Sequence, residues 1–212
     1  MPRWEGDAAG RLERAALELF DERGYDRTTV AQIAQRAGLN ERSFYRYFSD
    51  KREVLFGGSD ELEHHLAQTL RDMPTGPGPG PLDALLVAVG DAEQVFRPKE
   101  LLRIRERVIS ANPELREREL IKMDAIFATL VTVLQERGAD RTTARVATEL
   151  AIAIWRVAAD RWGHSDDSTF AAEVFDTARD FRQVAAGGRS GPTGDRLGTE
   201  GATAAGSGRY QD

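Results

Sequence analysis

The chain has 212 residues, enough for one sizeable domain or two modest ones, and its lack of cysteine excludes disulfides, thiol nucleophiles and cysteine-based zinc sites. The net charge of −6 disfavours contact with nucleic acid unless basic residues are gathered in one place. No apolar run approaches the length of a membrane span and the polar start has no secretory pattern, so we expect a cytoplasmic protein without a membrane partner.

The first predicted helix runs from about Gly10 to Arg23 and has a single apolar stripe along one face. The stripe is formed by Leu12, Ala15, Ala16, Leu19 and Phe20. Gly24 suits the left-handed conformation with which many helices end. Thr29 and Gln32 then form a possible capping box, in which each side chain bonds the backbone N–H of the other residue. This box predicts the start of a second helix.

A tight turn separates the second predicted helix from a third. Gly38 permits the sharp turn, and Asn40 can cap the third helix. Asp50, with Glu53 three residues later, is predicted to start a fourth helix that continues through Leu70. Two short helices around a tight turn are typical of a helix-turn-helix, which places its second helix in the major groove of DNA.

A proline-rich stretch divides the chain. Four prolines cannot continue a helix, so we predict a linker over residues 74–81, after a helix-turn-helix unit over 8–70 whose motif spans 29–48. A second unit is predicted over 82–186, and residues 187–212, of which eight of 26 are glycine, are expected to be a disordered tail. No stretch alternates as a strand would, so the predicted fold class is all-α. Helices of the second unit are predicted over 82–96, 100–111, 114–137, 142–162 and 167–186.

Positive charge is concentrated on the helix-turn-helix motif. Residues 27–52 contain six basic residues against two acidic ones, a local net charge of +4. The basic residues are Arg27, Arg36, Arg42, Arg46, Lys51 and Arg52. We therefore expect a specific DNA binder with weak non-specific affinity.

Residues 10 to about 70 resemble the DNA-binding domain of the TetR (tetracycline repressor) family. The resemblance rests on three segments, ALELFDERGY, TTVAQIAQRAGL and SFYRYFSDKREVL, the last of which combines paired aromatics with a following lysine. It implies an all-α homodimer with a homeodomain-like helix-turn-helix and a C-terminal ligand-binding and dimerisation domain over 82–186. It also implies a repressor that a small-molecule effector releases from DNA.

The resemblance implies a set of DNA contacts by matching position. The residues concerned are Thr29, Glu41, Arg42, Ser43, Tyr45, Arg46, Tyr47 and Lys51. Thr29 and Lys51 are expected at phosphates, and Arg42 among the residues that read base edges, since arginine is the commonest reader of guanine. Glu41 departs from the expected chemistry, because an anion in the groove lowers affinity unless it meets a cytosine amino group or an arginine. Alternatively, the tyrosines are packing residues and the arginines a solvated face.

Candidate ligand-binding residues in the C-terminal half are Phe127, Trp155, Arg156 and Trp162. The two tryptophans are seven residues apart and share a helix face, which leaves a pocket, a subunit interface and plain core open. Arg156 could hold an anionic ligand group, or it could pair with Asp160 four residues later.

Two further features bear on the effector and on metal binding. The segments RIRERVISAN and ANPELREREL are similar to a TetR subgroup tied to redox-peptide and acyl-thioester regulation, so their arginines could meet a coenzyme A phosphate of an acyl-CoA-like effector; the alternative is a charged helix face. His64 and His65 are adjacent, point about 100° apart on a helix and cannot chelate one metal together. We expect no metal and no cofactor.

The sequence therefore predicts a ligand-responsive transcriptional regulator, most often a repressor, that binds a palindromic DNA operator as a homodimer. The alternative is an all-helical enzyme, or a small-molecule-binding protein without operator-specific DNA binding. We expect no enzyme, because the chain lacks HExxH, a glycine-rich phosphate loop and a nucleophile–base pair in a recognisable context.

Overall fold

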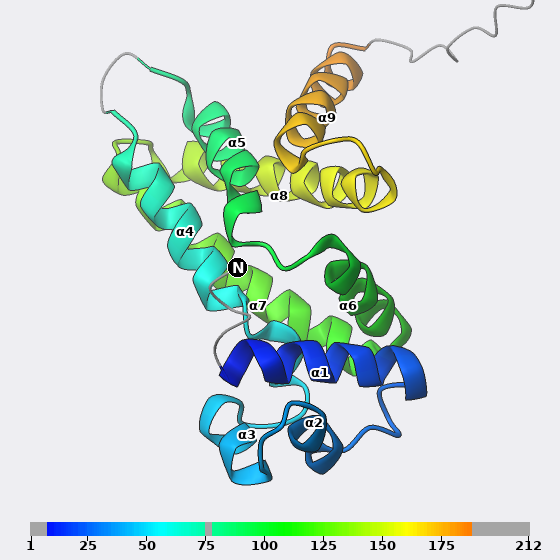
Figure 1. The fold of residues 1–212 in the computed structure, drawn as a ribbon. Coiled ribbons are helices and arrows are strands. Elements are labelled where there is room, and N and C mark those ends of the chain that lie inside the picture. The colour runs from blue at the N-terminus through cyan, green and yellow to red at the C-terminus, as the bar shows by residue number, and fades with distance from the viewer. Residues whose placement is uncertain (1–7, 75–77, 188–212) are drawn as a thin grey trace, which may run out of the picture.

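The computed structural model describes residues 8–74 and 78–187, and within these ranges every regular element is helical (Figure 1), which confirms the all-α prediction. Most of the predicted tail and the centre of the predicted linker lie outside the described residues. No helix in the described ranges has both the length and the apolar character that a membrane span requires. In chain order the elements are α1 (Ala8–Arg23), α2 (Val30–Arg36), α3 (Glu41–Tyr47), the 3-10 helix η1 (Glu53–Phe56), α4 (Ser59–Asp72), α5 (Pro81–Asp91), the 3-10 helix η2 (Ala92–Val95), α6 (Lys99–Ala111), α7 (Pro113–Glu136), α8 (Arg141–His164) and α9 (Phe170–Ala185).

The predicted signals at the ends of the first three helices are confirmed. Gly24 and Gly38 both have positive φ, at 84° and 69°, where a side chain would be strained. Thr29 Oγ1 accepts from the backbone N–H of Gln32 at 3.3 Å, and the Gln32 side chain accepts from the Thr29 N–H at 3.0 Å. Asn40 Oδ1 caps α3 by accepting from the Ser43 N–H at 2.9 Å. These contacts satisfy backbone donors that each helix start leaves unpaired.

The prediction of one continuous fourth helix is wrong in its first part. The Asp50 carboxylate does accept from the backbone N–H groups of Arg52 and Glu53, at 2.7 and 3.2 Å. The turn that it starts is only η1, and the glycine pair at positions 57 and 58 separates η1 from α4. Val54, Leu55 and Phe56 are buried on this short helix, so the break lets η1 and α4 face different parts of the core.

Two buried apolar clusters stabilise the fold. The first lies inside α1, α2, α3 and η1, with Leu12, Ile33 and Phe44 fully buried, and it extends into α6 and the start of α7. The second lies among α4, α5, α7, α8 and α9, where Leu70 and Phe170 are fully buried. Figure 1 shows α1 lying between the α2–α3 pair on one side and α6 and α7 on the other. The α2–α3 pair is thereby held at one end of the molecule.

Candidate nucleic-acid interface

Helix α3 has one buried anchor and an exposed outer face. Phe44 is fully buried and contacts Phe48, with ring centroids 5.5 Å apart, so it fixes the rotation of the helix. Tyr45 and Tyr47 are 56% and 43% exposed, and Arg46 between them is exposed as well. Large aromatic side chains in solvent are unusual enough on a monomer surface to indicate a contact face. Tyr45 also packs edge-on against the buried Phe44, with ring centroids 5.5 Å apart, so it combines a packing contact with an exposed surface.

Arg46 and Tyr47, which are neighbours on this face, form a cation–π contact and a hydrogen bond. The Arg46 guanidinium lies 4.8 Å from the centre of the Tyr47 ring and donates to the Tyr47 hydroxyl at 2.8 Å. A cation held over an aromatic face loses little freedom on binding, because its rotamer is already restricted. The pair thus presents one fixed positive charge with an aromatic surface beside it.

The first turn of α3 contains the three residues predicted to read bases. Arg42 and Glu41 are exposed, and within the described chain neither side chain forms a hydrogen bond or an ion pair. The predicted possibility that Glu41 pairs with a neighbouring arginine is therefore not realised. Ser43 is half-buried, and its hydroxyl donates to the cap residue Asn40 at 3.1 Å. Of the three, Glu41 and Arg42 have side-chain groups without a partner among the described residues, and Arg42 is the one with N–H donors.

Two residues predicted at phosphates lie at the edges of the motif. Thr29 is exposed at the N-terminus of α2, and its hydroxyl oxygen accepts from Gln32, which leaves its O–H able to donate. Lys51 donates to the Tyr25 carbonyl oxygen at 2.8 Å, with its ammonium 4.0 Å from the centre of the Tyr25 ring. Burial lowers the pKa of Lys51 from its ordinary value. Since an ammonium has three N–H groups, the contact with Tyr25 leaves donors for a phosphate.

The net charge of +4 on residues 27–52 is partly offset in the fold, because α1 packs behind the motif and brings two carboxylates to it. Arg36 donates to Glu22 through both terminal nitrogens, at 2.9 and 2.8 Å, and lies 3.5 Å from Glu18. The hydrogen bond from Arg36 lowers the pKa of Glu22. Arg52 pairs with Asp50 at 2.9 Å. Glu18 and Glu22 thus offset part of the +4 charge of residues 27–52, whereas Arg11 of α1, which donates to the Ala37 carbonyl oxygen at 3.3 Å, adds one positive charge.

The four candidate ligand-binding residues are not brought into one site. Phe127 lines an open groove of about 460 Å³ on α7 and α8. Trp155 and Trp162 belong to a cluster of four rings that we call the aromatic cluster, whose ring centroids lie 4.9 to 5.7 Å apart. Arg156 is exposed on the other side of α8. The members of the aromatic cluster are Phe96, Trp155, Trp162 and Phe170.

Several arginines in this half have partners that the sequence did not predict. The expected pair between Arg156 and Asp160 is wrong, since Asp160 lies 3.6 Å from His164 instead. The arginines of the segments compared with coenzyme A binders are largely engaged within the chain. Arg105 donates to Glu119 at 2.9 Å, and Arg118 donates to Glu53 at 2.6 Å. These pairs join α6, α7 and η1, which sequence spacing does not reveal.

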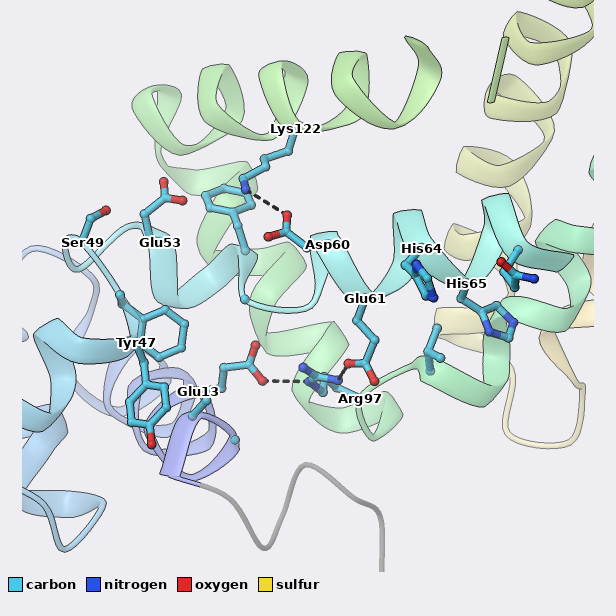
Figure 2. Close-up of a pocket in the computed structure, with 17 residues that line it drawn as sticks. Glu13, Tyr47, Ser49, Glu53, Asp60, Glu61, His64, His65, Arg97 and Lys122 are labelled. Atoms are coloured by element: carbon cyan, nitrogen blue, oxygen red, sulfur yellow. Dashed lines mark hydrogen bonds and ion pairs between the residues drawn. The ribbon is translucent and has the colours of Figure 1, made fainter. Parts of the chain in front are cut away.

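A larger cavity lies between the two halves of the molecule, and no sequence pattern predicted it. Its volume is about 940 Å³, and Figure 2 shows side chains from α1, the end of α3, α4 and α7 around it. Arg97 lies in this cavity with Glu13 on one side and Glu61 on the other. Its lining includes Phe48 and Phe56 of the first cluster together with polar residues of α4 and α7, so the cavity lies where the two halves meet.

Comparison with known proteins shows which proteins this chain is similar to. Residues 13–56 match the family described as bacterial regulatory proteins, tetR family. The HTH-type transcriptional regulator TcmR of Streptomyces glaucescens is 30% identical over 132 residues, which cover 60% of this chain and 58% of that protein. The uncharacterized HTH-type transcriptional regulator Rv2250c of Mycobacterium tuberculosis is 37% identical over 86 residues, covering 40% and 44%. The chain thus spans about half the length of these curated relatives.

Solved structures agree on the fold along most of the chain. A putative TetR-family regulator from Mesorhizobium loti has a TM-score of 0.56 at 18% identity, covering 87% of this chain and 98% of that one. FadR of Bacillus subtilis, solved in complex with stearoyl-CoA, has a TM-score of 0.55 at 18% identity, covering 80% and 95%. At this identity the likeness shows the fold alone. Residues 13–56 thus match the tetR family of bacterial regulatory proteins, the curated relatives are HTH-type transcriptional regulators, and the solved structures share the fold.

Proposed function

We propose that this protein is a transcriptional regulator, most simply a repressor, that inserts α3 into the major groove of a DNA operator. The supporting observation is the division of α3 between a buried Phe44 and an exposed face of arginine and tyrosine side chains. A helix anchored by one aromatic side chain keeps its outer face in a fixed orientation, as base recognition requires. The match of residues 13–56 to the family's DNA-binding region supports the same proposal.

Specific contacts follow from the free groups on that face. Arg42 is proposed to read a guanine through a two-pronged contact with O6 and N7, because its guanidinium has no partner among the described residues. Thr29 and Lys51 are proposed to bind phosphates on either side of the recognition helix. Tyr45 and the Arg46–Tyr47 pair are proposed to contact the sugar-phosphate backbone or the methyl group of a thymine.

A homodimer is proposed to present two such helices to a palindromic operator. Helix α8 exposes Val146, Ala153 and Val157, and the half-buried Leu150 lies between them at helical spacing. Phe175 is exposed on the neighbouring helix α9. An apolar strip of this kind on two adjacent helices suits a second copy of the same surface. The two α3 helices would then lie one or more DNA turns apart, as twofold half-sites require.

A small-molecule effector is proposed to act on the C-terminal half and lower DNA affinity. An acyl-CoA-like effector, suggested by the sequence and by the stearoyl-CoA complex of FadR, has weaker support. Arg105 and Arg118 would have to leave intramolecular carboxylates before meeting its phosphates. The chemical class of the effector therefore rests on binding experiments with the purified protein.

Selection of bound duplexes from a random DNA pool tests the proposed function. The expected result is an enriched sequence with twofold symmetry at moderate ionic strength. The same selection with Arg42→Ala should give a motif that has lost preference at one position in each half-site. A pool that stays random with the wild-type protein would contradict the proposal. That result would favour the alternative function, an all-helical enzyme or a small-molecule-binding protein without operator-specific DNA binding.

A further inference from the structure

Three charged residues link the helix-turn-helix unit to the rest of the molecule. Arg97 donates to Glu13 of α1 at 2.8 Å and to Glu61 of α4 at 3.0 Å, as Figure 2 shows. The side chains of Arg97 and Glu13 are only 15% and 9% exposed, so their pair is largely removed from water. Removing one partner of such a pair leaves a charge buried without its counter-ion, which is strongly unfavourable. We call Glu13, Arg97 and Glu61 the Arg97 triad.

The backbone next to the triad is shaped to admit it. A Cβ atom at Gly57 would clash with the Glu13 carboxylate and would lie 3.0 Å from a ring carbon of Phe48. A Cβ atom at Gly58 would lie 3.4 Å from a terminal nitrogen of Arg97. These two glycines form the break between η1 and α4. The point at which α4 leaves the helix-turn-helix unit therefore makes room for the Glu13 carboxylate that Arg97 binds, and Arg97 itself lies beside Gly58 at an ordinary van der Waals distance.

The residue before Arg97 belongs to the core of the C-terminal half. The Phe96 ring lies 5.5 Å from Trp155, 5.7 Å from Trp162 and 4.9 Å from Phe170 between centroids. The same connecting segment is tied to α9, because the Glu93 carboxylate accepts from the Phe170 N–H at 2.8 Å. Consecutive Cα atoms are only about 3.8 Å apart, so a shift of the Phe96 ring displaces Arg97 as well.

We propose that Arg97 is a positioning residue that transmits rearrangements of the aromatic cluster to the helix-turn-helix unit. Arg97 sets the orientation of α1 relative to α4 through its two carboxylate partners. A ligand or substitution that moves the aromatic cluster moves Phe96, shifts Arg97 and changes the position of α3. The biological meaning of this coupling rests on the proposed DNA-binding function, but the coupling itself is a property of the free protein.

Distance measurements between two spin labels test the orientation without DNA. The chain has no cysteine, so Gln35→Cys on α2 and Gln135→Cys on α7, both exposed, give specific labelling sites. Labelled chains are diluted into unlabelled protein so that only distances within one chain count. Arg97→Gln should broaden the distance distribution, and it should weaken binding to a selected operator by about tenfold. Arg97→Lys should partly restore the narrow distance distribution and the operator affinity. Lysine keeps the positive charge but cannot form the two-pronged contact.

Arg107→Gln is the matched control. Arg107 also joins α6 to α1, through Asp21 at 2.6 Å, but the two side chains are 60% and 47% exposed. An exposed ion pair contributes little to the energy that fixes two elements. The control should therefore leave the distance distribution unchanged. If Arg97→Gln and Arg107→Gln behave alike, the proposal is overturned.

A double-mutant cycle separates transmission from simple structural support. Trp155→Leu alters the aromatic cluster in which Phe96 packs and should shift the label distance in the wild-type background. It should cause no further shift in Arg97→Gln, because the connection is already lost. Additive shifts would contradict transmission through Arg97.

The two proposals fail in different ways. If no operator is selected but Arg97→Gln broadens the distances, the positioning role stands and the proposed function falls. If the operator binds and the distances do not change in Arg97→Gln, only the positioning role falls. Should Arg97→Gln not fold, Glu61→Gln replaces it, because Glu61 is half-exposed and its loss leaves the Glu13 pair in place. A smaller broadening is expected for that variant, and an unchanged distribution contradicts the proposal.

Discussion

The ammonium group of Lys51 lies 4.0 Å from the centre of the Tyr25 ring and donates to the Tyr25 carbonyl oxygen at 2.8 Å. The contact ties the loop after α3 to the turn between α1 and α2. Tyr25 is buried, and this burial raises the pKa of its hydroxyl to about 12, so the ring stays neutral. Lys51 thus has a structural contact in addition to the phosphate contact proposed for it.

Lys51→Ala should weaken DNA binding uniformly across sequences and lower the salt slope by about one unit, because one phosphate contact is lost. It should also lower the free energy of unfolding by about 1 kcal/mol through loss of the contact with the Tyr25 ring. Titrations of fluorescent duplexes at several salt concentrations, beside denaturant melts, measure both effects. Lower stability with an unchanged slope would mean that Lys51 has only the structural role.

Arg42→Ala should cost about 1–3 kcal/mol of binding to the selected operator and relax preference at one base position. Arg36→Ala is the matched control, since Arg36 lies in the same motif but its guanidinium is held by Glu22. Binding to a set of operators with single base changes distinguishes the two variants. Equal losses on every sequence would place Arg42 at a phosphate and not at a base.

Substitutions at the adjacent residues Phe44 and Tyr45 of α3 should have different effects, the first mainly on folding stability and the second mainly on DNA binding. Phe44→Ala removes a fully buried ring and should cost about 3–5 kcal/mol of unfolding free energy. Tyr45→Ala removes a ring that is 56% exposed and packs edge-on against Phe44, so it should cost only about 1 kcal/mol of stability while weakening DNA binding. Chemical denaturation and duplex titration of both variants measure this contrast. A stability loss as large for Tyr45→Ala as for Phe44→Ala would contradict this difference.

Acid should destabilise the start of α8 through Asp140. Hydrogen bonds from the Thr143 hydroxyl and from backbone N–H groups lower the pKa of Asp140 below its ordinary value of 3.8. Since the folded state binds the proton less tightly than the unfolded state, this stabilisation is present above pH 3.8 and is lost as the pH falls below it. Asp140→Asn retains an N-cap without titrating, so its melting temperature should fall less between pH 5 and pH 3. If the melting temperatures of the wild-type protein and of Asp140→Asn fall equally with pH, Asp140 is not the group responsible for the acid sensitivity.

Local sequence signals predicted the helix-turn-helix well. The capping box of Thr29 and Gln32, the Asn40 cap and the glycines at 24 and 38 act within a few residues, so their chemistry can be read from spacing. The buried Phe44 follows from the same logic, because an apolar residue on a short amphipathic helix must face the core.

Contacts between distant parts of the chain were not predictable in this way. The neutralisation of Arg36 depends on carboxylates 14 and 18 residues earlier, and the Arg97 contact with Glu13 spans 84 residues. The break at Gly57 also reflects a distant side chain, since Glu13 occupies the space that a Cβ atom would need. The sequence offers no spacing rule for such pairs, whose geometry exists only after α1 packs on the rest of the fold.

The most direct test of operator recognition is the ratio of two dissociation constants. They are measured at about 0.15 M salt for a selected duplex and for a scrambled duplex of the same composition. Recognition through α3 predicts that the wild-type protein binds the selected duplex about a thousandfold or more tightly than the scrambled one. The ratio of the two dissociation constants should be smaller for Arg42→Ala. Equal affinities for the two duplexes would contradict the account.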